Sequence, residues 1–221
     1  MYDFAMALNA GIAFLCVATC VALAQSESPK GLVWKPLRII DSRSHLPNAT
    51  VPKEMVGRLQ ISNLDIVLED TDMKDAQARF GGTLGDEGDA GDSLEWLCLS
   101  GVDSAGQWVL WLESGEIDAD SISSFQWRRV PSGTAFDKRC AALSRADSRV
   151  TLPVALTLGI PETEVLRVLG KPTARQGETL LYVHEHEEVV KGESFTALNT
   201  TTVLIRDGKV WAIEVGKSTT S

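Results

Sequence analysis

One order of structural elements occurs twice along this 221-residue chain, and the repetition limits its possible folds more than any other feature. Each half has a helix-like run that ends at glycine and then three strand-like runs. In the first half these runs cover residues 71–80, 94–99, 108–113 and 122–130. In the second half they cover residues 161–169, 179–187, 200–206 and 209–215. The repetition predicts two modules of one kind.

The second helix-like run carries clear local signals. Pro161 suits the start of a helix, and Gly170 suits its left-handed exit. Val165, Val168 and Leu169 have the spacing of a single apolar face, so this short helix must pack on another element. We therefore predict an α+β fold of two tandem modules, each a short helix or helix pair packed on an antiparallel β-sheet.

This organisation divides the chain into four segments. Residues 1–24 are predicted to be a signal peptide and residues 25–31 a linker. The first α+β module, with an N-terminal extension, covers 32–145, and the second module covers 146–221. Within the second module, Asp207-Gly208 lies between two apolar runs and predicts a tight β-hairpin.

The N-terminal leader predicts export to the periplasm or out of the cell. Residues 4–24 carry no charge and end in the small-residue sequence Ala22-Leu23-Ala24, which suits signal peptidase. The run is also about 20 residues long, enough to span a bilayer, so an uncleaved anchor is an alternative. Cys20 follows a threonine in a poor lipidation motif, and lipid anchoring there is a further alternative. After cleavage we expect no membrane span.

Cleavage of the leader would leave two cysteines, Cys98 and Cys140, in an oxidising compartment. Two cysteines there favour one disulfide, which would close a long loop and restrict the unfolded chain. The alternative is two separately buried thiols. Nothing in the sequence beside either cysteine marks it as a nucleophile.

The second half resembles a known family through the motifs at 158–160, 164–165, 168–173 and 181–183 and the hairpin at 207–208. These motifs resemble the BamE (SmpA/OmlA) family of outer-membrane assembly lipoproteins and the related tandem fold of β-lactamase inhibitory protein. The resemblance implies a protein-binding scaffold of helix-plus-antiparallel-sheet repeats and brings no catalytic residues. It also implies an acylated cysteine near the mature N-terminus, where Cys20 is a poor match.

Charge and composition exclude several classes of function. The formal net charge of −9 would repel nucleic acid over most of the surface, so no nucleic-acid partner is expected. No cofactor is expected either. Alternation along a strand places His184, His186 and Glu188 on one face, where they could bind zinc. A metal-dependent hydrolase that uses these three residues is the catalytic alternative.

The positions of four tryptophans suggest a surface that binds another protein. Trp96, Trp108 and Trp111 fall on strands that are apolar on both faces, and Trp127 and Arg128 lie at the end of the next strand, beside that face. An exposed face bearing these residues would suit a protein partner, because Trp and Arg are frequent anchors of interfaces. The alternative is that segment 32–69 or the neighbouring repeat covers this face. The sequence thus predicts an exported, non-catalytic module that binds an envelope or secreted protein as an assembly factor or inhibitor.

Overall fold

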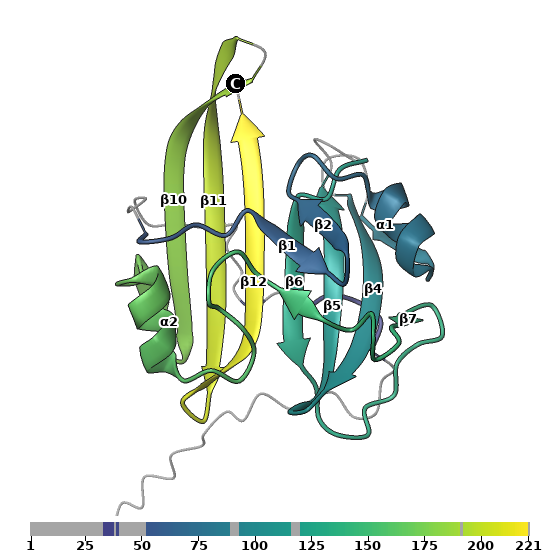
Figure 1. Cartoon of the computed structure of the whole chain (residues 1–221). Coiled ribbons are helices and arrows are strands. Elements are labelled where there is room, and N and C mark those ends of the chain that lie inside the picture. Colours follow the sequence, from purple (N-terminus) through teal and green to yellow (C-terminus); the bar gives the residue numbers. More distant parts are fainter. Residues whose placement is uncertain are drawn as a thin grey trace, which may run out of the picture. The chain divides into compact units, whose positions relative to one another are not determined.

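A computed structural model describes residues 33–37, 39, 52–88, 93–115, 120–190 and 192–220. The predicted signal peptide and linker lie outside the described residues. The elements, drawn in Figure 1, are β1 (Arg58–Ile61), β2 (Leu64–Val67), α1 (Met73–Phe80), β3 (Leu84–Glu87), β4 (Leu94–Asp103), β5 (Gly106–Gly115), β6 (Ser124–Arg129), β7 (Ala141–Ala142), β8 (Val150–Thr151), α2 (Glu162–Leu169), β9 (Ala174–Gln176), β10 (Thr179–Val190), β11 (Glu193–Arg206) and β12 (Lys209–Thr220).

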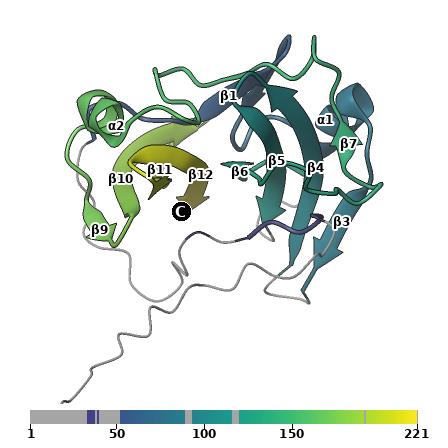
Figure 2. The same cartoon turned by 90° about the horizontal axis from the view of Figure 1, so that it is seen from below.

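A single large sheet includes strands from both halves of the chain. Its order is β3-β4-β5-β6-β12-β11-β10-β9, with β7 paired in parallel to β4 and every other pair antiparallel. A smaller sheet has the order β2-β1-β8. In Figure 2, α1 lies on the β4 side of the large sheet and α2 on the β10 side.

The predicted α+β class is wrong, because this is a largely β fold. Strands make up 53% of the described residues and helices 10%. Each helix has eight residues, about two turns, which is too short to cover a sheet face alone. The predicted helix-on-sheet modules also share one sheet instead of having one each, because β6 pairs with β12 from Arg128↔Ala212 to Ser124↔Gly216.

Polar side chains hold the N-terminal extension, described at residues 33–37 and 39, across this β6–β12 junction. Gln126 on β6 is 1% exposed, and its Nε2 donates to Oε2 of Glu214 on β12 at 3.0 Å. The backbone N–H of Leu37 donates to Gln126 Oε1 at 3.3 Å, and that of Ile39 donates to Glu214 Oε2 at 3.2 Å. The extension therefore contacts strands from both halves of the sheet.

Local signals placed the helices and the hairpin correctly. α1 begins after Asp72, whose carboxylate accepts a hydrogen bond from the Lys74 N–H, and α2 ends at Gly170 with φ of 81°. Asp207 and Gly208 both have positive φ and connect β11 to β12. Neither helix in the described residues has the length and apolar character needed to cross a membrane.

Two apolar clusters pack on opposite faces of the large sheet. The first face packs against the small sheet, α1 and α2, through residues that include Leu59, Ile66, Met73, Val165, Leu110 and Val203. The second face of β4 and β5 packs against the N-terminal extension and the loop before β7, through Trp34, Trp96, Cys98, Val109, Trp111, Val130 and Cys140. Both faces of this half of the sheet are therefore covered.

Two cross-strand glycines make room for large indole rings. Gly85 lies opposite Trp96, and Gly101 lies opposite Trp108. A Cβ atom at either glycine would overlap the indole of its partner, so each ring lies across a position that must lack a side chain. The two pairs lie on opposite faces of the sheet.

We predict that Gly101→Ala lowers the free energy of unfolding by about 1–3 kcal/mol, because the added methyl group forces Trp108 out of its packed position. Gly115→Ala is the matched control: it is also a strand glycine, and its nearest neighbour would be Ser123 Oγ at 3.8 Å. This control should change stability by less than about 0.5 kcal/mol. Urea denaturation of both variants tests the prediction, and equal effects would contradict it.

Candidate functional site

The four tryptophans predicted to form a binding face lie in the interior. Trp96, Trp108 and Trp111 are at most 1% exposed, and Trp127 is 3% exposed. Trp108 and Trp127 pack edge to face with ring centroids 6.3 Å apart, and the half-buried Arg128 lies over the Trp111 ring at 5.8 Å. The expectation of an exposed Trp-rich face is therefore wrong, because both faces of this half of the sheet are covered.

The N-terminal extension covers the second face, as the alternative reading of the sequence proposed. Trp34 packs edge to face on Trp96, with centroids 5.8 Å apart, and its carbonyl oxygen accepts a hydrogen bond from Trp111 Nε1 at 2.9 Å. Replacing these indoles by alanine would remove core packing, so such variants cannot test surface binding.

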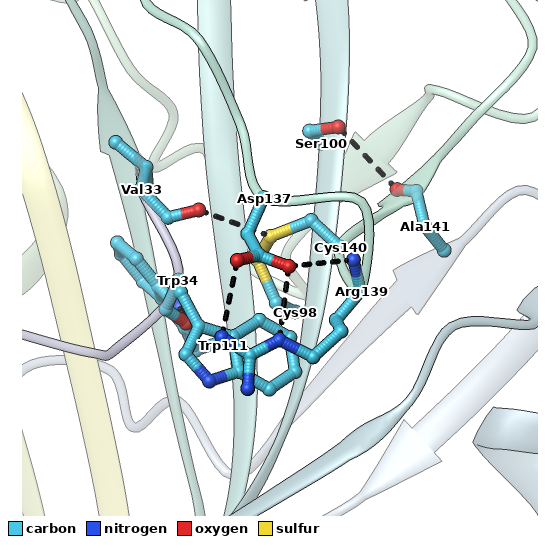
Figure 3. Close-up of a disulfide and its surroundings, with 9 residues drawn as sticks. All are labelled: Val33, Trp34, Cys98, Ser100, Trp111, Asp137, Arg139, Cys140 and Ala141. Atoms are coloured by element: carbon cyan, nitrogen blue, oxygen red, sulfur yellow. Dashed lines mark hydrogen bonds and ion pairs between the residues drawn. A yellow bond between two sulfur atoms is a disulfide. The ribbon is translucent and has the colours of Figure 1, made fainter. Parts of the chain in front are cut away.

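The predicted disulfide is confirmed: Cys98 on β4 is bonded to Cys140 in the loop before β7. Figure 3 shows the bond beside Trp34 and Trp111. Arg139 lies over the Trp34 ring at 4.1 Å and donates through Nε to Asp137 at 2.9 Å. Hydrogen bonds from Arg139 lower the pKa of Asp137 to about 2, so the pair stays charged at neutral pH. The loop and the extension are thus held on the second face by covalent, ionic and aromatic contacts.

His184, His186 and Glu188 do share one face of β10, as alternation predicted. The two imidazole rings stack with centroids 5.1 Å apart. Glu188, however, forms an ion pair with Lys217 Nζ at 2.8 Å, so an ammonium group already neutralises the carboxylate that a metal would need. Within the described residues, no group of three or more His, Cys, Asp and Glu side chains is arranged to hold a metal ion. The structure therefore offers no support for a metal-dependent hydrolase at these residues.

Lys217 links three segments at this end of the sheet. Its ammonium lies 3.3 Å from Glu69 Oε2 and 2.8 Å from Glu188 Oε2, and Thr219 Oγ1 donates to Glu69 at 2.6 Å. Burial alone lowers the pKa of Lys217, but hydrogen bonds to the two carboxylates outweigh it and raise the pKa above the ordinary lysine value. This network fixes β10 and β12 relative to the loop that follows β2.

A pocket of about 230 Å³, a volume that includes space open to solvent, lies beside β10 and β11. Its lining residues come from the segment before β1, α2, β10 and β11: Pro52, Glu54, Met55, Val56, Leu169, Tyr182, His184, Asn199 and Thr201. Oδ1 of the buried Asn199 has no hydrogen-bond partner in the part of the chain that the structure describes. Burial raises the pKa of Tyr182 to about 12, so its hydroxyl stays protonated and donates to the Gly170 carbonyl at 3.2 Å. The volume is below the usual range for organic ligands and suits ordered water better.

The outer edge of β10 is the remaining candidate. β9 pairs with β10 only along Thr179–Leu181, and the Val183 N–H donates to Thr173 Oγ1 at 3.0 Å. Beyond that point, no strand among the described residues pairs with the outer side of β10 as far as Val190. Figure 1 shows the β10–β11 hairpin extending past the end of β6.

Alternation decides which backbone groups face outward along this edge. The N–H of Val183 points away from β11, so those of Glu185, Glu187 and Val189 do the same. Glu185 and Glu187 are exposed, and Val189 is 71% exposed. We call these three residues the acidic edge; it combines outward backbone donors and acceptors with two carboxylates and a valine.

Sequence reasoning missed this edge and its supporting network. We expected a strand that ends at Glu187 and a partner strand that begins at Thr200, whereas the hairpin runs through Val190 and Glu193. The threonines at 196, 200, 201 and 202 favour strand and were the available signal. The contact between Lys217 and Glu69 could not be predicted from the sequence, because ion pairs between distant segments leave no local pattern.

We predict that the double variant Cys98→Ala/Cys140→Ala loses about 4 kcal/mol of stability, because the disulfide joins residues 42 positions apart and restricts the unfolded chain. Urea denaturation of the variant and of reduced wild-type protein should give matching curves, both below the oxidised protein. Peptide mapping without reductant should recover the linked peptides. Unchanged stability, or free thiols at both positions, would refute the prediction.

Comparison of the chain with protein-family models, with curated proteins and with solved structures gives no match. The resemblance to the BamE family therefore stays a prediction.

Proposed function

We propose that this chain is an exported, non-catalytic module that binds another protein in the cell envelope or outside the cell, as an assembly factor or inhibitor. The acidic edge is the observation that carries the proposal. A row of outward backbone N–H and C=O groups is a ready template for another polypeptide. Protein-binding domains commonly use such an edge by accepting one more strand.

The disulfide supports the proposed location in the periplasm or outside the cell. A bond between Cys98 and Cys140 persists in the periplasm or outside the cell, where thiols are oxidised. The uncharged leader at 4–24 agrees with export. These two features are independent, since one lies in the leader and the other inside the folded unit.

We predict that a photo-crosslinking residue at position 187 captures one defined polypeptide in the cells that make this protein. The side chain of Glu187 is exposed on the acidic edge, so the probe replaces no core contact. Excess unlabelled chain should abolish the adduct, and mass spectrometry identifies the captured protein.

Lys138, exposed in the loop beside the disulfide, is the matched control position. A probe there should give no such adduct. Adducts from position 138 alone would mean that the chain binds a protein, but at a surface other than the acidic edge. If neither position yields a specific adduct, the proposed function fails.

We also predict that the exported chain begins at Gln25, because signal peptidase cleaves after the small residue Ala24. Mass spectrometry of the N-terminal peptide from the extracytoplasmic fraction measures this. An acylated N-terminus at Cys20 would instead favour a lipid-anchored structural envelope protein. Recovery of intact residues 1–24 would indicate a retained anchor.

A further inference from the structure

We propose that the partner binds as an extended, basic segment that adds a strand to the acidic edge. This inference rests on the proposed function and names the chemistry of its partner. The geometry of β10, the charge of its side chains and the repulsion between two copies of the chain support it in turn.

β9 shows where an added strand would lie beside β10. β9 lies antiparallel beside β10 only at Thr179–Leu181, opposite Ala174–Gln176. A segment that continues the line of β9 would meet the outward N–H and C=O groups of Glu185, Glu187 and Val189. At about 3.3 Å per residue, this part of β10 accommodates roughly six or seven residues of a partner.

The side chains at this edge select for positive charge. Glu185 and Glu187 point to one face and are exposed, whereas Glu188 on the other face is neutralised by Lys217. Directly opposed residues of paired strands have Cβ atoms about 4.5–5.5 Å apart, and opposite charges at that spacing attract. Lysines or arginines at alternate positions of the partner would therefore face the carboxylates of Glu185 and Glu187.

The same charges disfavour a second copy of this chain. Pairing of two acidic edges would bring Glu185 and Glu187 of one copy against those of the other. Like charges directly opposed across a strand pair are destabilising. Acidic side chains on an edge thus suppress self-association and leave the backbone open to a chain of opposite charge.

The test uses the full chain and a short synthetic peptide in which lysine and valine alternate. Fluorescence anisotropy should detect binding that weakens as salt is raised. Hydrogen exchange at the Glu185, Glu187 and Val189 amides should slow when the peptide binds. A peptide with glutamate in place of lysine should not bind. A lysine peptide N-methylated at alternate amides should bind at least tenfold more weakly, since it loses hydrogen bonds and keeps its charge.

Substitutions on the protein separate backbone pairing from charge. Glu187→Pro removes one outward N–H, and proline is tolerated at an edge position that faces solvent, so we expect binding at least tenfold weaker with the fold retained. Glu187→Ala loses the carboxylate alone and should weaken binding less. The melting curve of each variant verifies folding, and the N-methylated peptide tests the wild-type chain without any substitution.

Several results would overturn the inference. Equal binding of the N-methylated and the unmethylated lysine peptides would mean that charge alone holds the peptide, without backbone pairing. No binding of the lysine peptide would exclude the proposed site altogether. Slow exchange at the three amides in the free chain would mean that the edge is already occupied. A dimer dissociated by Glu187→Pro would identify a second copy as the occupant. If the protein captured in cells binds Glu187→Pro as well as wild type, the proposed function stands and this inference fails.

Discussion

Five residue pairs between β6 and β12 connect the two halves of the chain, from Arg128↔Ala212 to Ser124↔Gly216. This pairing joins strands from the two halves into one sheet, with Gln126 and Glu214 opposite each other at the junction. The same two side chains bind the backbone of the N-terminal extension at Leu37 and Ile39. One junction therefore sets both the strand order of the sheet and the path of the segment that covers its second face.

This strand order explains why the core needs so little helix. With both halves in one sheet, the first face is covered by the small sheet together with two short helices, and the second face of β4 and β5 by Trp34 and the loop through Cys140. The Trp-rich strands that looked suited to a partner are enclosed by these layers. The disulfide and the Arg139–Asp137 pair hold the covering loop where a binding surface had been expected.

The junction also determines which strand lies at the edge of the sheet, where its outward backbone groups can bind another chain. Because β12 lies beside β6 and β11 beside β12, β10 becomes an outer strand that only the short β9 follows. The Lys217–Glu188–Glu69 contacts support the inner side of the hairpin while Glu185 and Glu187 face solvent. Exposed carboxylates at the edge and the ion pairs behind it both support the proposed role in recognition.

Signals within a few residues of one another were enough to predict the local elements. Proline at 161, glycine at 170 and the Asp207-Gly208 turn act through backbone conformation within a few residues, so helix ends and the hairpin could be predicted. The disulfide could also be predicted, because Cys98 and Cys140 are the two cysteines that follow the leader. Three features could be learned only from the fold: the halves share one sheet, the tryptophans are core and β10 lies at an edge. These outcomes depend on contacts between distant segments such as β6 and β12, and alternation along a strand says which residues share a face but not what covers that face.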